Sequence, residues 1–344
     1  MTLAVKTLAL SSAFAIICAL PAAAEFRYDT SSGGEVLFYG HLNPAYQSFD
    51  DGVTTTRTVV DSGHSNSRVG FWVRQPLGAG QFAFNFETGL GLRPGGAVTQ
   101  GFTPDEFRWR RTNIRKVDLS LKTANAGTFY LGQGSMATDG AAETDLSGTA
   151  LVLYVSVPDS AAAFRFRDST GALTTRTIGG NFGDFDGGRL GRIRYDTPSL
   201  AGFTLSVAYG EEILAQNVNL KTRDIALRYA QDFNGARVEG SIGYKRVTPA
   251  NAQEFNDTIG SISVLLPSGF NVTLAAGRRS TAGSYTYGKL GYRGDWFSVG
   301  ETAIAVDYYN GKDRTVAGSQ SDAYGLGIIQ KFERANIEAY LGWR

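Results

Sequence analysis

Apolar and polar residues alternate with a period of two along much of this chain, and this feature constrains its fold more than any other. In residues 81–87, three phenylalanines alternate with small or polar residues, and residues 203–209, 224–230 and 270–276 repeat the pattern. A strand places successive side chains on opposite faces, so this period predicts strands with one apolar and one polar face. A helical period never continues for more than about two turns. The sequence therefore predicts an all-β fold.

The links between the predicted strands alternate between long and short. Residues 49–65 form a long link and 76–80 a short one, and this order continues along the chain, with turn residues such as Asn234-Gly235 in the short links. A soluble β-sandwich has no reason to keep its long loops at one end, whereas an outer-membrane barrel has brief periplasmic turns and longer extracellular loops. We therefore predict one transmembrane antiparallel β-barrel. Its fifteen predicted strands lie near residues 35–48, 66–75, 81–90, 112–122, 128–133, 189–197, 202–210, 220–232, 236–246, 254–266, 270–279, 285–293, 296–310, 321–332 and 336–344.

The first 24 residues have the pattern of a cleaved signal peptide. Lys6 precedes an apolar stretch over residues 8–20, and small residues at 22–24 offer a cleavage site before Glu25. No later stretch approaches 18 apolar residues, so no transmembrane helix is expected. Residues 25–344 show no linker or change of composition. We therefore expect an exported chain with a signal peptide over 1–24 and a single barrel over 25–344.

Charge and cysteine content exclude several classes of function. The chain has 33 basic and 32 acidic residues, and removal of Lys6 with the signal peptide leaves 32 of each. A nucleic-acid-binding protein needs a basic excess on one face, so that class is not expected. The one cysteine, Cys18, lies in the signal peptide, which excludes thiol catalysis and thiolate metal sites in the exported chain. The two histidines, His41 and His64, belong to no catalytic or metal-binding motif, so neither an enzyme nor a cofactor is predicted.

Three segments resemble the Gram-negative general porins. They are residues 66–71 with the following strand 81–87, residues 121–133, and residues 192–209, of which the last is the most specific. The resemblance implies a 16-stranded homotrimeric barrel in the outer membrane, in contact with lipid and lipopolysaccharide. It also implies a third loop, here residues 134–188, that folds toward the lumen and narrows it.

The resemblance further implies an acidic bank on the third loop and a basic bank on the facing wall. The loop offers Asp139, Glu143 and Asp145. The loop departs from the family pattern, because it is very long and contains an apolar run over residues 151–157 whose role the sequence leaves open.

The basic bank draws its candidates from the polar faces of the strands. Arg68, Arg192 and Arg194 alternate with outward apolar residues, so they point inward. Alignment of motifs selects Arg115, whereas the strand alternation points Arg115 outward and Lys116 inward. A β-bulge would bring Arg115 inward as well, so both residues remain candidates.

These features predict a channel for passive diffusion of small hydrophilic solutes and ions. The alternative is a substrate-selective channel, in which Tyr154, Phe164 and Phe166 of the third loop contact a sugar or an aryl solute. An outer-membrane enzyme or adhesin is a weaker third hypothesis. Saturable block of the current by a solute would separate the first two.

Closure of the barrel raises a further expectation. If the first predicted strand starts on the periplasmic side, the fifteenth runs outward and leaves Arg344 on the extracellular side. Unpaired strand edges are costly in hydrocarbon, so the barrel has to close. Either the first and fifteenth strands pair in parallel, or the chain is a truncated form of a longer porin; of these we favour truncation.

Overall fold

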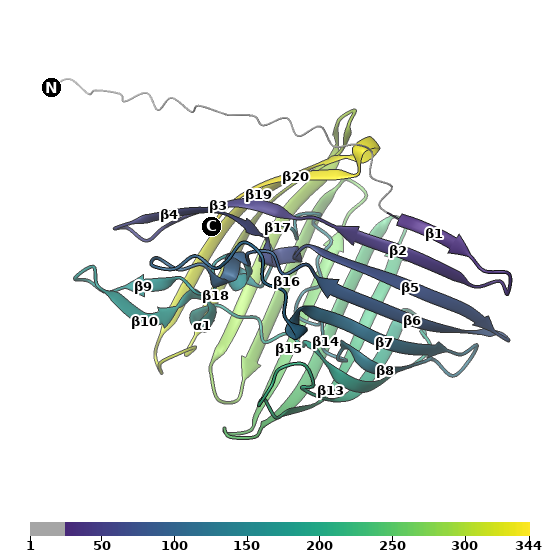
Figure 1. Cartoon of the computed structure of the whole chain (residues 1–344). Helices are drawn as coiled ribbons and strands as arrows, with labels where there is room; N and C mark the ends of the chain where they lie inside the picture. The colour runs from purple at the N-terminus through teal and green to yellow at the C-terminus, as the bar shows by residue number, and fades with distance from the viewer. Residues whose placement is uncertain (1–24) are drawn as a thin grey trace.

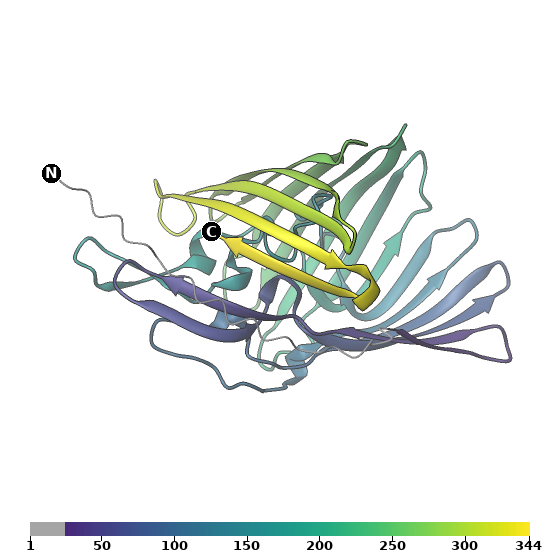
Figure 2. The same cartoon turned by 90° about the horizontal axis from the view of Figure 1, so that it is seen from above.

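The computed structural model describes residues 25–344, so the predicted signal peptide lies outside the described residues. Sixteen strands form one antiparallel sheet that curves around a central space (Figures 1 and 2). In sheet order they are β1 (Glu25–Asp29), β2 (Glu35–His41), β5 (Arg68–Leu77), β6 (Gly80–Gly89), β7 (Ile114–Lys122), β8 (Thr128–Ser135), β11 (Arg189–Asp196), β12 (Phe203–Glu211), β13 (Leu220–Phe233), β14 (Ala236–Pro249), β15 (Phe255–Leu265), β16 (Phe270–Arg279), β17 (Ser284–Phe297), β18 (Gly300–Lys312), β19 (Gln320–Phe332) and β20 (Ile337–Trp343).

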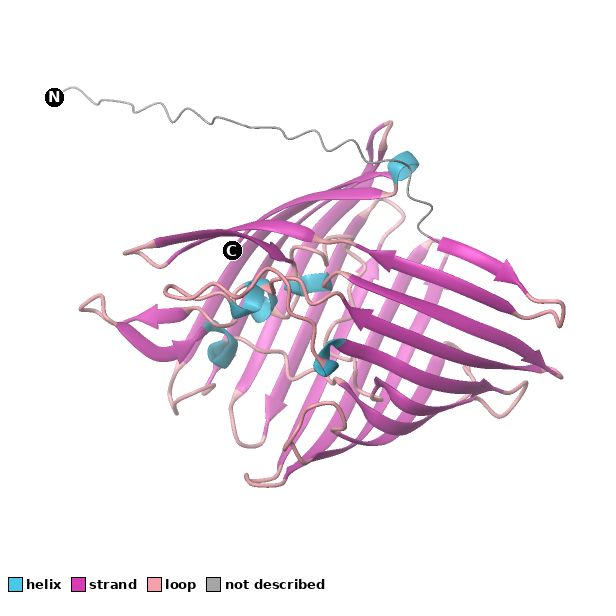
Figure 3. Cartoon of the chain, viewed as in Figure 1, coloured by secondary structure: helices cyan, strands magenta, loops and turns pink. Residues whose placement is uncertain are grey.

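The remaining elements lie in the long links (Figure 3), apart from one short helix in the link before β20. Two hairpins pair β3 with β4 and β9 with β10. The described residues contain no helix long and apolar enough to cross a membrane. The elements are β3 (Pro44–Asp50), β4 (Thr55–Asp61), β9 (Arg165–Arg167), β10 (Leu173–Thr177), α1 (Ile178–Asn181) and the 3₁₀ turns η1 (Gly63–Ser65), η2 (Gly95–Ala97), η3 (Arg111–Asn113), η4 (Val157–Ser160) and η5 (Glu333–Ala335).

The two faces of the sheet have inverted polarity compared with a soluble protein. On β16, Phe270 and Leu274 are 59% and 54% exposed, whereas Asn271 and Thr273 are only 2% and 3% exposed. The apolar residues therefore face outward and the polar residues face the interior. This arrangement suits a barrel surrounded by hydrocarbon, and it confirms the all-β transmembrane barrel that the alternation predicts.

The predicted count of fifteen strands was wrong, because the missing strand is the first one rather than the last. Strand β1 follows directly after the expected cleavage site and pairs along its five residues with β2. Its alternation of Phe26 and Tyr28 with charged residues is too short to stand out as a strand. The predicted strand 35–48 is two elements, since β2 ends at His41 and the chain enters the β3–β4 hairpin at Pro44.

The sixteenth strand also excludes parallel closure, which was one of the two alternatives considered for the barrel. Every pairing in the large sheet is antiparallel, so β1 and β20 run in opposite directions and a parallel pairing between them is excluded. Within residues 25–344 no hydrogen-bonded ladder joins these two edge strands. Strand β20 pairs with β19 only from Phe332 to Leu326, so Arg344 lies beside the middle of β19 (Figure 2).

The third loop packs against the inward faces of the later strands. Phe182 and Phe185 of the loop form a buried cluster with Tyr285, Tyr287 and Tyr309 of the wall. The apolar run 151–157 belongs to this packing, because Val152 and Leu153 lie directly against three wall glycines. A side chain at any of these glycines would overlap the loop; they are Gly325, Gly327 and Gly342. The run therefore fills the interior beside β19 and β20.

Candidate pore constriction

Hydrogen bonds from the wall fix the path of the third loop. The backbone N–H and hydroxyl of Thr138 both donate to Asp224 Oδ2 on β13, at 2.8 and 2.7 Å. Ser261 on β15 donates to the carbonyl of Ala141 at 2.8 Å and accepts from the N–H of Thr144 at 3.0 Å. Polar inward residues of the wall thus satisfy backbone groups that would otherwise be buried without partners.

Asp145 of the predicted acidic bank forms a buried ion pair with the wall. Lys289 Nζ on β17 lies 2.5 Å from Asp145 Oδ2, and the side chain of Lys289 is fully enclosed. The same ammonium group donates to Ser147 Oγ, Thr149 Oγ1 and the carbonyl of Leu153. One cation therefore gathers residues 145–153 around a single point of the wall.

Glu143 lies in a group of buried carboxyl groups on the two arms of the loop. Burial, followed by the neighbouring carboxyl groups of Asp186 and Asp184, raises the pKa of Glu143 well above its ordinary value. Burial also raises the pKa of Asp186, whose oxygens accept hydrogen bonds from Gly140 N and Ala142 N. Asp139, the third predicted acid, lies 3.7 Å from Arg189 at the start of β11.

The basic wall consists of Arg68, Arg115 and Lys116, which gather around the carboxylate of Glu87. Arg115 Nε donates to Glu87 at 2.6 Å, and Arg68 lies 3.8 Å from the same carboxylate. The register between β6 and β7 shifts here, since Glu87 pairs with Lys116 and Thr88 pairs with Ile114. Arg115 is the extra residue of this β-bulge, which brings both candidates inward: Lys116 Nζ lies 5.9 Å from the ring centre of the inward-facing Trp72.

Arg192 and Arg194 point inward, as the alternation predicts, but both are engaged in local contacts. Arg192 forms a two-pronged ion pair with Asp118, at 3.0 and 2.8 Å, and is only 4% exposed. Arg194 pairs with Asp196 and donates to the carbonyl of Met136 at 2.9 Å. Both arginines therefore hold the beginning of the third loop against β8 and β11.

Several residues of this arrangement were not singled out from the sequence. The alternation of their strands places Glu87 and Lys289 on the inward face, and this position was the feature of the sequence that could have identified them. Arg189 has no such signal, because its outward phase at the start of β11 gives no indication that it reaches Asp139. Among residues 25–344, no group of three or more His, Cys, Asp or Glu side chains could hold a metal ion.

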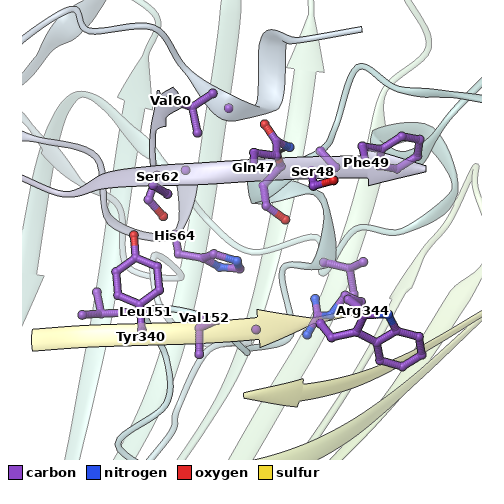
Figure 4. Close-up of a pocket in the computed structure, with 18 of the residues that line it drawn as sticks. Gln47, Ser48, Phe49, Val60, Ser62, His64, Leu151, Val152, Tyr340 and Arg344 are labelled. Atoms are coloured by element: carbon purple, nitrogen blue, oxygen red, sulfur yellow. Dashed lines mark hydrogen bonds between the residues drawn. The ribbon is translucent and has the colours of Figure 1, made fainter. Parts of the chain in front are cut away.

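One aromatic residue of the alternative hypothesis, Phe166, lies at a groove next to β20. The groove, of about 830 Å³, lies between the β3–β4 hairpin, the third loop and the ends of β19 and β20 (Figure 4). Phe166 lines it and is partly exposed, whereas Phe164 is fully buried and stacks on Phe49. The Tyr154 hydroxyl donates to Asp159. Phe166 alone of the three thus offers a ring to a solute.

His64 also lines this groove. Its ring packs edge-on against Tyr154, with 5.1 Å between the ring centres, and burial lowers the pKa of His64 to about 3. Tyr340 of β20 extends toward Ser62 in Figure 4, and its hydroxyl donates to Asn43 Oδ1 at 2.7 Å. The neutral imidazole and these contacts join the first long link to the third loop and to β20.

Comparisons with known proteins agree with the barrel fold. The sequence model of the Gram-negative porins matches residues 8–342. Salmonella typhi OmpF, solved in complex with daunomycin, is 11% identical with a TM-score of 0.55, over 92% of this chain and 98% of that chain. OmpT of Vibrio cholerae is 15% identical with a TM-score of 0.53, over 89% and 85%. The outer-membrane channel DcaP of Acinetobacter baumannii is 10% identical with a TM-score of 0.53, over 88% of each chain. No curated protein matches the sequence.

Proposed function

This chain belongs to the Gram-negative porin family and is an outer-membrane channel, and we propose that small hydrophilic solutes and ions diffuse passively through it past a charged constriction. The basic wall of Arg68, Arg115 and Lys116 forms one side of this constriction. The third loop forms the other side. Selectivity in such a channel arises from the width of the passage and the charges around it.

The observation that carries this proposal is the concentration of cations at the basic wall. Three cationic side chains surround one carboxylate, Glu87, so the wall keeps a net positive charge. Two unit charges about 8 Å apart at an effective dielectric constant of about 40 interact by roughly 1 kcal/mol. This energy orients a dipolar solute and biases ion flow without binding either one tightly.

The acidic residues of the loop have different roles in this proposal. Asp139 is the loop carboxylate linked to the basic wall, because it lies 3.7 Å from Arg189, whose charge also acts on Arg68 and Lys116. Asp145 anchors the loop through its ion pair with Lys289, whereas Glu143 lies among the buried carboxyl groups within the loop. Arg192 and Arg194 position the base of the loop and do not contact the solute directly.

Current measurements in planar bilayers test the proposal. Wild-type protein should give a steady conductance that rises in proportion to the concentration of salt or small solute. The double variant Arg68→Glu/Arg115→Glu should keep the conductance but move the reversal potential toward cations. A correctly folded barrel that carries no ion current would contradict the channel. An unchanged reversal potential would contradict the proposal that the basic wall lines the constriction.

A substrate-selective channel is the second candidate function, and the groove lined by Phe166 favours it. A sugar or aryl solute stacked on Phe166 would reach the backbone and hydroxyl groups of the β3–β4 hairpin. Such a channel would show current that a specific solute blocks saturably, and Phe166→Ala would abolish that block. The buried position of Phe164 leaves a single ring for stacking, so we favour the general channel.

We also propose a homotrimer embedded in outer-membrane lipid and lipopolysaccharide. The outward faces of β2, β5 and β6 carry bulky apolar residues, including Phe38, Val69 and Phe82, which suit either lipid or a neighbouring subunit. The long link 90–113 exposes Phe102 and Phe107, and its Arg111 donates to the carbonyl of Leu214 in the same chain. Native mass spectrometry in mild detergent should show trimers; only monomers would contradict this assembly.

A further inference from the structure

A polar cavity of about 450 Å³ lies at the end of the barrel that carries the long links. It is formed by the link between β16 and β17, residues 280–283, and the link between β18 and β19, residues 313–319. Strands β16, β17 and β18 lie side by side in Figure 1. The polar side chains that line the cavity include three arginines, and they are Arg278, Arg279, Ser280, Thr281, Ser284, Asp313, Arg314 and Thr315.

Arg314 has donors that the protein itself does not satisfy. Its Nε and Nη1 atoms are enclosed and have no hydrogen-bond partner. Within residues 25–344, no carboxylate oxygen lies within 4.0 Å of its guanidinium group. A charged donor that is enclosed without a partner is costly, so such a group in a folded protein calls for an explanation, such as an acceptor that is not part of the protein.

The ring of Phe185 holds a second guanidinium group close to the first. The Cζ atom of Arg314 lies 4.0 Å from the ring centre, and the Cζ atom of Arg279 lies 4.8 Å from it. Phe185 has a left-handed backbone conformation with φ of 58°, which is unusual for a bulky residue. The third loop thus presents this ring to two like charges and keeps them together.

The carboxyl groups of this region do not neutralise Arg314. Asp257 is engaged by Arg279 through two hydrogen bonds of 2.8 Å, and Lys245 lies 3.3 Å from it. Asp313 Oδ1 accepts from the backbone N–H of Gly318 and thereby shapes the link 313–319. Asp184 is buried, and its pKa is raised chiefly by that burial; its carboxylate oxygens lie more than 4.0 Å from the guanidinium group of Arg314.

We propose that this cavity binds a small oxyanion, a phosphate or carboxylate group, between Arg279 and Arg314 with Arg278 at its outer side. The planar guanidinium group donates along two parallel directions and matches the oxygens of such a group. Hydroxyl groups of Thr281 and Ser284 at the cavity provide further donors. Arg279 shares the inward face of β16 with Asn271 and Thr273, whereas Arg278 has the outward phase, so the cavity lies on the rim between the two faces. There it would hold anionic solutes before they reach the basic wall.

Isothermal titration of the full exported chain in detergent micelles, with inorganic phosphate at low ionic strength, tests the site. Wild-type protein should bind phosphate saturably with one site per chain. Arg314→Gln should weaken binding by about tenfold, as expected for the loss of one charge-assisted pair of hydrogen bonds. Arg314→Lys should recover only part of the affinity, because an ammonium group lacks the fork geometry.

The matched control is Arg246→Gln, which removes an exposed arginine from the outward face of β14, two strands away from β16 in the sheet, where it pairs with Glu254. This variant should bind phosphate like the wild type. A second arm replaces phosphate by vesicles that contain phosphatidylglycerol: weaker binding to the vesicles in Arg314→Gln would identify a lipid phosphate as the source of the anion. Absence of saturable binding in both arms would overturn the site. Equal affinity of wild type and Arg314→Gln, or equal loss in Arg246→Gln, would also overturn it.

Discussion

Replacement of Lys289 by methionine should release part of the third loop from the wall. The ammonium group of Lys289 lies 2.5 Å from Asp145 and also donates to Ser147, Thr149 and the carbonyl of Leu153. Methionine fills a similar volume but donates no hydrogen bond. The variant therefore leaves a buried carboxylate without its counter-ion, together with three acceptors that lose a donor.

The size of the effect follows from the burial of this pair. Removal of one partner from a buried ion pair costs about 3–5 kcal/mol, because the remaining charge stays uncompensated. Part of the loop can open to water without unfolding of the barrel, so this cost should appear as local opening. A cost of about 3 kcal/mol corresponds to a rise of roughly a hundredfold in the population of the open loop.

Hydrogen exchange of residues 145–153, followed by mass spectrometry in micelles, measures that opening. Lys331→Met is the matched control: Lys331 pairs with Glu301 at 3.0 Å but is partly exposed, so its loss should cost less than about 1 kcal/mol. The double variant Asp145→Asn/Lys289→Met should recover part of the protection, since no charge is left unpaired. Unchanged protection of residues 145–153 in Lys289→Met would refute the reasoning, as would equal loss in Lys331→Met.

Three further predictions address selectivity, pH and the lipid face. Arg68→Glu should shift the reversal potential in a KCl gradient toward cations, and a shift of the same size in Arg246→Glu would show that the position is irrelevant. The docked loop should lose stability as pH rises from about 4 to about 7, because burial raises the pKa of Asp159 and of Asp186 to about 7. The native state therefore holds more protons than the unfolded state in this window. Amide hydrogen exchange of residues 136–188, corrected for the intrinsic rate, should be faster at pH 8 than at pH 5, and slower exchange at pH 8 would count against this prediction. If Val272 faces the middle of the bilayer, Val272→Lys should lower the free energy of unfolding, measured by urea titration, by about 2–4 kcal/mol. The variant Val272→Thr is the comparison: an equal loss of stability in the two variants would argue against a lipid-facing position.

The strands and their faces could be predicted because they depend on local pattern. A strand with one face toward lipid and the other toward water has to alternate, and a shift by one residue would expose every polar residue to hydrocarbon. The observed β13, β15 and β16 accordingly lie within about two residues of the predicted strands. Strand β1 was missed because five residues next to a signal peptide carry too few alternations to separate a strand from a tail.

Arg115 marks the limit of reasoning from alternation alone. In a regular strand the alternation would point the Arg115 side chain outward. In the structure Arg115 is the extra residue of a β-bulge between the Glu87–Lys116 and Thr88–Ile114 pairs, and its side chain points inward. Nothing in residues 112–117 requires a bulge, since the gain comes from the contacts of Arg115 with Glu87 and Asn66, which lie on other strands or links. A pattern of period two can therefore place a residue on a face only up to the next bulge.

The third loop shows why a list of charges did not predict which of them line the passage. Asp139, Glu143 and Asp145 are separated by only six positions, yet they reach Arg189, a group of buried carboxyl groups and Lys289 respectively. A loop without a regular period gives no rule for the direction of its side chains, so their partners depend on how the loop docks. That docking depends on the wall: Lys289 and the glycines of β19 and β20 act as the template for residues 145–153. The charge of the passage is therefore a property of the packed loop, and substitutions at the wall should change it as strongly as substitutions in the loop itself.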